Sequence, residues 1–142
     1  MNPVPINYFA VVAAAASSIV LGFLWYGPLF GKPWMAMMGC NEESMKKAKE
    51  KGMGSTFALM ILGSLVMSYV MAYSLIFASA YLKASGASAG LMAGFWNWLG
   101  FVAPVVMGAQ LWEGKPWKLF LIQGGYYLVS FCLMGVILAL WT

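Results

Sequence analysis

The chain has 142 residues, of which 63% are hydrophobic and 8% are charged, whereas soluble domains are roughly 45–50% apolar and about 25% charged. This composition excludes an ordinary soluble domain, and the length suits a single membrane domain over residues 1–142. The net charge of +4 comes from lysine, without arginine or histidine. Lysines gathered in one loop do not match a nucleic-acid-binding face, so we expect no nucleic-acid partner.

Four long stretches are almost free of charged residues: 7–26, 55–82, 89–112 and 117–141. A helix needs about 20 residues to cross a hydrocarbon core of about 30 Å. Because lipid offers no hydrogen-bond partners to the backbone, each stretch must be a helix or part of a closed barrel. Barrel strands are only about ten residues long and alternate in polarity. We therefore predict an all-α integral membrane protein with four transmembrane helices.

The positions of the lysines predict how these helices are oriented. Only Lys83 falls on one side of the predicted topology, and the other lysines fall on the opposite side. The positive-inside rule assigns the lysine-rich side to the cytoplasm. We therefore expect a multi-pass protein of a cell membrane, of the bacterial inner-membrane type, with both termini outside. The lysines on the cytoplasmic side are Lys32, Lys46, Lys47, Lys49, Lys51, Lys115 and Lys118.

The first cytoplasmic loop contains a short amphipathic element at about residues 32–52. Asn41 can cap a helix over residues 42–51, and Gly52 can end it. The segment before this helix is rich in methionine and tryptophan and can lie in the plane of the interface. The helix would be supported by two favourable i,i+4 ion pairs, Glu42 with Lys46 and Glu43 with Lys47.

The tetrapeptide Gly-Lys-Pro-Trp occurs twice, at residues 31–34 and 114–117. Each of these residue types is favoured at a membrane-interface turn, so coincidence explains the repeat. The alternative is that the chain consists of two duplicated helical hairpins, related by an axis along the membrane normal. Under either explanation, Lys32 and Lys115 are candidates for binding an anionic headgroup, because lysines near the membrane surface attract anionic lipid.

Three of the predicted helices carry small residues at a spacing of four, which allows close contact between helices in lipid. The sequence does not distinguish contacts within one chain from contacts between chains. Because four helices enclose little interior space, we expect a homo-oligomer. The stripes are Ala10, Ala14, Ser18 and Gly22 in the first helix, Ser64, Ser68 and Ala72 in the second, and Gly86, Gly90 and Gly94 at the start of the third.

The third helix also carries a polar residue near its centre. Pro104 frees the carbonyl of Gly100 from its usual helical bond, and a freed carbonyl beside the amide of Asn97 would suit a hydrated path. Alternatively, Asn97 bonds to a neighbouring helix, with Gln123 as the expected partner, while Gln110 is expected to be solvated. In a regular helix one face would contain Ala93, Asn97, Gly100, Pro104 and Gly108.

The chain lacks the residues that most enzymes need. It has no His and no Asp, and its four Glu residues all lie outside the apolar stretches, so general acid–base chemistry has few candidates. We expect no enzymatic activity and no cofactor. A cluster of Met35, Met37, Met38 and Cys40 could bind Cu(I), but flexible apolar residues at an interface explain it better, and we expect no metal site.

Several motifs together resemble one known family. They are WYGPLFGKPW at residues 25–34, WLGF at 98–101, EGKPW at 113–117 and GYY at 125–127. These motifs resemble the small membrane proteins grouped as domain of unknown function 1761, and the resemblance covers nearly the whole chain. It implies a short integral membrane protein without an established activity, and it carries over no catalytic residues.

Two functions fit these observations. The first is a self-assembling protein with a channel- or carrier-like role for a small neutral or weakly polar solute, because no charged residue lies near the centre of a predicted span. The alternative is a structural or accessory membrane protein that binds lipid or a partner through its lysine-bearing loop.

Overall fold

The structure is a computed structural model that describes residues 6–39, 42–83 and 85–141. This part of the chain is mostly helical and contains no strand. Its elements are α1 (Tyr8–Leu24), the π-helix η1 (Trp25–Leu29), α2 (Gly31–Met38), α3 (Glu42–Glu50), α4 (Gly54–Leu82), α5 (Gly86–Asn97), the π-helix η2 (Trp98–Val102), α6 (Ala103–Glu113) and α7 (Trp117–Leu140).

Four helices in the described ranges are long and apolar enough to cross a membrane. They confirm the predicted all-α fold with four spans, and every helix end lies within three residues of its predicted position. The first and third spans each contain a π-helical stretch, which the sequence analysis did not predict. The spans are Tyr8–Leu29, Gly54–Leu82, Gly86–Glu113 and Trp117–Leu140.

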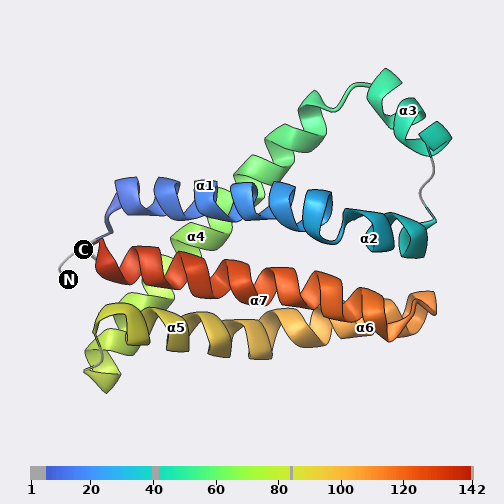
Figure 1. Ribbon diagram of the computed structural model, residues 1–142. Helices are drawn as coiled ribbons and strands as arrows, with labels where there is room; N and C mark the ends of the chain where they lie inside the picture. The colour runs from blue at the N-terminus through green and yellow to red at the C-terminus, as the bar shows by residue number, and fades with distance from the viewer. Residues whose placement is uncertain (1–5, 40–41, 84, 142) are drawn as a thin grey trace.

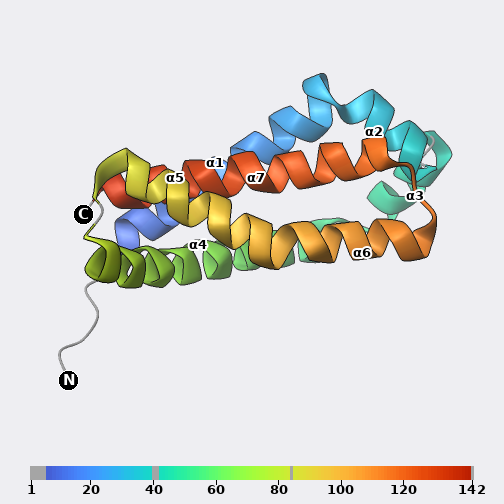
Figure 2. The same cartoon turned by 90° about the horizontal axis from the view of Figure 1, so that it is seen from below.

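The last span, α7, lies at the centre of the bundle. Figure 1 shows α1 on one side of α7 and α5 with α6 on the other, and α7 contacts all of these elements. The span α4 crosses them obliquely. Figure 2 shows α4 on one side of α7 rather than in line with it. As a result, α4 diverges from the other spans at its N-terminal half, where residues 54–63 are all exposed.

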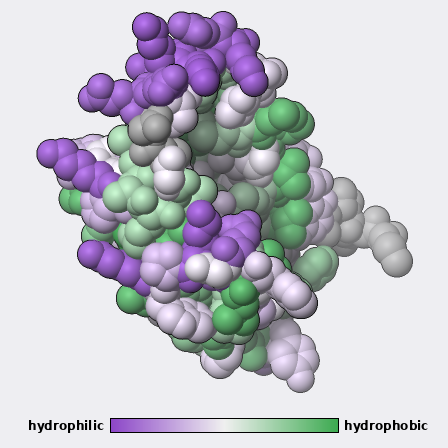
Figure 3. All heavy atoms as spheres, turned by 90° about the vertical axis from the view of Figure 1, so that its right-hand side faces the viewer, coloured by the Kyte–Doolittle hydropathy of each residue, from purple (hydrophilic) through white to green (hydrophobic). Residues whose placement is uncertain are grey.

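The two ends of the bundle differ in charge. Ile6, Trp141 and the connection between α4 and α5 lie at one end, which we call the terminal end (Figure 1). The helices α2 and α3 and the turn between α6 and α7 lie at the opposite end, which we call the lysine end. Every lysine except Lys83 belongs to the lysine end. Figure 3 views this end and shows the hydrophilic side chains gathered over α3 and around the turn.

The closest helix contact joins α5 to α7 through glycine. A Cβ added to Gly94 would lie 2.6 Å from the carbonyl oxygen of Phe131, and one added to Gly90 would collide with the backbone of Gly135. Such distances are too short for any side chain, so the two backbones touch. Gly86 has a different role, because it starts α5 with a φ of 73°. Two glycines of the predicted stripe therefore pack within one chain.

The small residues of the stripe in α1 also make helix contacts within the chain. Ala10, Ala14 and Ser18 are buried, and α1 packs against both α4 and α7. The hydroxyl of Ser68 in α4 donates a 2.8 Å hydrogen bond to the carbonyl oxygen of Val11. This bond satisfies a fully buried polar group and ties α4 to α1.

The two copies of the Gly-Lys-Pro-Trp repeat have different structures. Residues 31–34 form the start of the helix α2, and Trp34 is half-buried. In the second copy Gly114 ends α6 with a φ of 67°, Pro116 is extended, and Trp117 is exposed. The repeat in sequence is therefore not a repeat in local structure.

The short helix α3 (Glu42–Glu50) agrees with the helix predicted over residues 42–51. The Glu43 carboxylate lies 3.9 Å from the Lys47 ammonium, and Gly52 follows with a φ of 83°. The predicted capping residue, Asn41, lies outside the described residues. All nine residues of α3 are exposed, and Figure 1 shows this helix apart from the four spans.

Gly90→Ala tests the glycine contact between α5 and α7. The added methyl group would force the two backbones apart, which should cost about 1–3 kcal/mol of stability. Gly108→Ala is the matched control, because a Cβ at Gly108 meets no atom within 4 Å. Thermal unfolding in detergent should show a lower midpoint for Gly90→Ala alone. Equal midpoints for the two variants would contradict the contact.

Candidate functional site

Asn97, the central polar residue of the predicted path, connects α5 to α4. Its Nδ2 donates hydrogen bonds to Ser74 Oγ at 2.9 Å and to the carbonyl oxygen of Ala93 at 2.8 Å. Ser74 belongs to α4 and Ala93 to α5. The amide is thus placed as a contact between two spans. It does not pair with Gln123, which had been the expected partner.

Gly100 and Pro104 do not share a face with Asn97. Both are exposed, and a Cβ at Gly100 would meet no atom within 4 Å. The predicted face assumed a regular α-helix, but η2 lies between Asn97 and Pro104. A π-turn adds one residue, which rotates all later side chains by roughly 100°. Asn97 therefore faces α4, while Gly100 and Pro104 face away from the bundle.

Gln110 and Gln123 form a polar pair at the lysine end. Gln110 Nε2 donates a 2.7 Å hydrogen bond to Gln123 Oε1, and Gln123 Nε2 lies 4.0 Å from the sulfur of Met38. Gln110 was expected to be solvated, but it is only 4% exposed. Its Oε1 has no hydrogen-bond partner in the described part of the chain. The pair connects α6 with α7, and the sulfur contact extends it to α2.

Two tryptophans donate hydrogen bonds to the backbone of α7 from opposite sides. Trp25 begins η1 and donates from Nε1 to the carbonyl oxygen of Ile122 at 2.9 Å. Trp98 begins η2 and donates from Nε1 to the carbonyl oxygen of Gly124, also at 2.9 Å. A Cβ added to Gly125 would lie 3.3 Å from the Trp25 ring. Small residues in α7 therefore make room for the indole rings.

The sequence contains a signal for this tryptophan pair that the prediction did not use. Each π-helix begins with Trp-x-Gly, and a proline lies inside η1 and just after η2. Proline has no N–H group and disturbs the regular helical bonding, and a local π-turn is one way to accommodate this change.

Beside this pair lies a cavity of about 460 Å³ between α1, α4 and α7, which we call the aromatic pocket. The Tyr26 ring lies 5.2 Å from that of Trp34 and 5.3 Å from that of Tyr126, and Tyr126 lies 5.0 Å from Tyr127. Successive rings are inclined by 59–60°. The hydroxyl of Tyr126 is held by a 2.9 Å bond to the carbonyl oxygen of Ser18. The rings therefore line one side of the pocket in contact with one another.

The other residues that line the aromatic pocket are uncharged, and they include flexible methionine side chains. Met60, Met67 and Ser64 line it from α4, and Ser130 lines it from α7. The described residues around this cavity include no charged side chain. The indole N–H of Trp34, from α2, is buried without a partner among the described residues.

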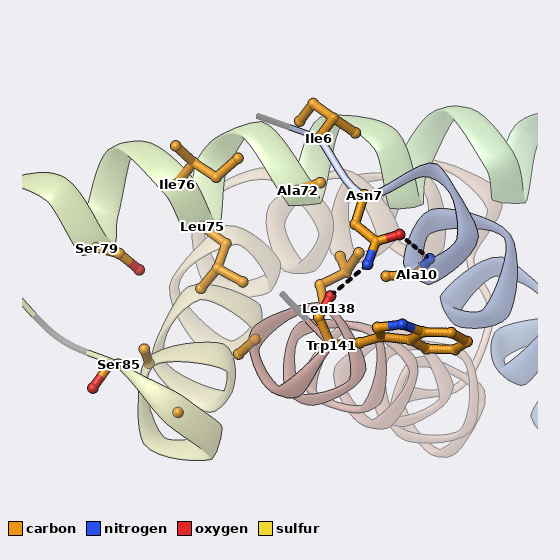
Figure 4. A pocket seen from close by; sticks show the side chains of 13 residues that line it. Ile6, Asn7, Ala10, Ala72, Leu75, Ile76, Ser79, Ser85, Leu138 and Trp141 are labelled. Atoms are coloured by element: carbon orange, nitrogen blue, oxygen red, sulfur yellow. Dashed lines mark hydrogen bonds between the residues drawn. The ribbon is translucent and has the colours of Figure 1, made fainter. Parts of the chain in front are cut away.

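A second cavity of about 550 Å³, the terminal pocket, lies where the spans meet at the terminal end (Figure 4). Asn7 sits at its edge and accepts hydrogen bonds from the backbone N–H groups of Phe9 and Ala10 at 3.1 and 3.2 Å. Asn7 Nδ2 donates to the carbonyl oxygen of Trp141 at 3.0 Å, which joins the ends of α1 and α7. The wall is mainly apolar, with Leu75 and Leu138 among its residues.

The two headgroup candidates, Lys32 and Lys115, do not line a common cavity. Lys32 lies in α2 and lines a groove against α3, together with Lys46 and Lys49. Lys115 lies in the turn between α6 and α7, and its backbone N–H bonds to the carbonyl oxygen of Gln110 at 3.1 Å. Lys32 therefore shares a groove with Lys46 and Lys49 and not with Lys115.

Trp25→Phe and Trp98→Phe test the two indole hydrogen bonds to α7. Each change removes one partly buried donor, which should cost about 1 kcal/mol, and the two costs should add because each indole bonds a different carbonyl. Trp112→Phe is the control, since Trp112 is 93% exposed. Unfolding by sodium dodecyl sulfate in mixed micelles, followed by circular dichroism, measures the three variants. A loss at Trp112 as large as at the other two positions would contradict the assignment.

Comparison with known proteins identifies the family. A family profile described as "Protein of unknown function (DUF1761)" matches residues 9–139. No curated protein and no solved structure matches the chain. The matched range contains Trp25, Trp98 and the tyrosine and tryptophan rings that line the aromatic pocket. The resemblance seen in the sequence is confirmed, and the chain belongs to the DUF1761 family of membrane proteins.

Proposed function

We propose that this protein lies in a cell membrane with both termini outside and acts as a carrier for a small neutral or weakly polar solute. One observation carries the proposal: two cavities, the aromatic pocket toward the lysine end and the terminal pocket at the other end, follow one another along the same three spans. The spans α1, α4 and α7 line both.

Buried residues lie between the two cavities along each of the three spans. Along α1, Ala14 lies between the residues that line one pocket and those that line the other, and Ser68 in α4 and Met134 in α7 occupy the equivalent positions. All three are 0% exposed. A carrier needs two cavities that are separated by buried residues. A modest shift of the spans could then expose a bound solute first to one side of the membrane and afterwards to the other.

The aromatic pocket has the character of a site for an uncharged molecule. Binding sites for small molecules are commonly 300–1,000 Å³ in volume and mostly apolar, with a few polar groups. Here tyrosine and tryptophan rings and methionine thioethers supply the apolar contacts, and Ser64 and Ser130 supply hydroxyl groups. A charged solute would lose its water shell without gaining a partner. The proposal involves no enzymatic step.

Helix α2 closes the aromatic pocket toward the lysine end. It is held by the Tyr26–Trp34 ring contact and by the approach of Met38 to Gln123. The buried indole N–H of Trp34 has no acceptor among the residues that the structure describes, and such a group favours rearrangement because an unpaired buried donor costs about 1–3 kcal/mol. Displacement of α2 would relieve this cost and open the pocket.

The proposal does not require the homo-oligomer that we expected from the small-residue stripes. The stripe residues Ala10 and Ala14, together with Gly90 and Gly94, are used in contacts within the chain. One bundle contains both cavities and the buried residues between them. We therefore propose the single four-span bundle as the carrying unit, whether or not it assembles further.

Cysteine labelling tests the proposed orientation. In a background with both native cysteines replaced by serine, Lys83→Cys should react with a membrane-impermeant maleimide added to intact cells. Lys47→Cys should react only after the cells are opened, because its loop carries most of the lysines and should lie inside. The reverse pattern would overturn the orientation.

Gly63→Phe tests the carrier. Gly63 lines the aromatic pocket at the exposed part of α4, and a Cβ there meets no atom within 4 Å, so a larger side chain can be added at the edge of the pocket without a clash at its Cβ. Gly108→Phe is the matched control, on α6 and away from the pocket. In liposomes, stopped-flow light scattering follows the entry of urea and glycerol, and radiolabel uptake follows nicotinamide.

At least one of these probes should enter faster than into protein-free liposomes. Gly63→Phe should return that rate to the protein-free level, while Gly108→Phe should leave it unchanged. Rates no faster than those of protein-free liposomes for all three probes, or equal rates for the two variants, would count against the carrier.

A further inference from the structure

A groove of about 670 Å³ lies between α2 and α3 at the lysine end. Lys32 reaches it from α2, and Lys46 and Lys49 reach it from α3. Met35 and Met45, one from each helix, also line it. We call this feature the lysine groove. Its lining combines lysine with methionine side chains.

The described residues do not balance the positive charge of the lysine groove. Its three lysines face one carboxylate, that of Glu42. The ion pair that the structure shows on α3 joins Glu43 to Lys47, outside the groove. None of the three groove lysines has an ion-pair partner within residues 6–39, 42–83 and 85–141. The groove therefore offers a net positive charge to an external anion.

The position of α2 determines how far the lysine groove lies from the end of the first span. Its first residue, Gly31, follows the end of the first span at Leu29 by two positions. A Cβ at Gly31 would lie 2.6 Å from the carbonyl oxygen of Tyr26, so the chain turns tightly here. The contact of Trp34 with Tyr26 then holds α2 against the end of the span. The lysine groove thus opens where lipid headgroups meet water.

We propose that the lysine groove binds the headgroup of an anionic phospholipid. The three ammonium groups surround the phosphate, and the two methionines contact the glycerol and the first carbons of the acyl chains. Lysine suits this role, because its long apolar stem lies along lipid while its ammonium group reaches the phosphate. The apolar side chains of Met35, Ala36 and Met45 in the lining favour a lipid over free phosphate. This inference is independent of the carrier, because the lysine groove and the aromatic pocket share no lining residue.

The expected gain in affinity follows from the number of lysines. A lysine near an anionic surface contributes about fivefold in affinity, which corresponds to about 1 kcal/mol. Replacing all three should therefore weaken binding by about 100-fold if the effects add. All three lysines are exposed, so their replacement by glutamine should leave the bundle folded.

The test compares two triple variants of equal charge. Lys32→Gln, Lys46→Gln and Lys49→Gln together remove the groove lysines. Lys47→Gln, Lys51→Gln and Lys118→Gln together remove three lysines of the same end that do not line the groove. Native mass spectrometry from a nonionic detergent measures the binding of dioleoyl phosphatidylglycerol, with dioleoyl phosphatidylcholine as the neutral comparison. Glycerol 1-phosphate is added as a competitor that has the phosphate but no acyl chains.

The native protein should prefer phosphatidylglycerol over phosphatidylcholine, the groove variant should lose that preference, and the control variant should keep most of it. Glycerol 1-phosphate should compete poorly. An equal loss in both variants would show general electrostatic attraction and overturn the site. The absence of a preference in the native protein would do the same. Effective competition by glycerol 1-phosphate would assign the groove to free phosphate esters and overturn the lipid proposal.

Discussion

The absence of water around the spans is the constraint on which the rest of the structure depends. In hydrocarbon, apolar side chains gain little by meeting one another, so helices associate where their backbones can come close and where polar groups need partners. Gly90 and Gly94 let α5 touch α7 near Gly135. The indole N–H groups of Trp25 and Trp98 then bond to carbonyls of α7. The central span is thus held by backbone contact, by partly buried indole donors and by the close packing of buried side chains such as Met134.

These contacts also explain where the bundle is open. The span α5 follows α7 closely because glycine permits it, whereas α4 crosses obliquely and is tied to α1 by Ser68. The oblique crossing leaves space on both sides of that tie. The aromatic pocket and the terminal pocket occupy this space, and the fully buried side chains of Ala14, Ser68 and Met134 close it between them. The proposed carrying function is therefore a consequence of how the helices pack.

Much of the fold could be predicted because exclusion of charge and spacing of small residues are local properties of the sequence. The bounds of the four spans follow from the first property, and the contacts of Gly90, Gly94 and Ala14 from the second. The polar pairs could not be predicted in this way. A single π-turn at η2 separates Asn97 from Gly100, and the pairing of Gln110 with Gln123 depends on how α6 lies against α7. Both are set by tertiary structure.

Hydrogen–deuterium exchange in lipid nanodiscs tests most directly the claim that hydrocarbon surrounds four helices of this chain. The backbone amides of Tyr8–Leu29, Gly54–Leu82, Gly86–Glu113 and Trp117–Leu140 should exchange orders of magnitude more slowly than those of the exposed helix α3, because both internal hydrogen bonds and the absence of water protect them. Exchange along the length of any one span as fast as that of α3 would contradict the account.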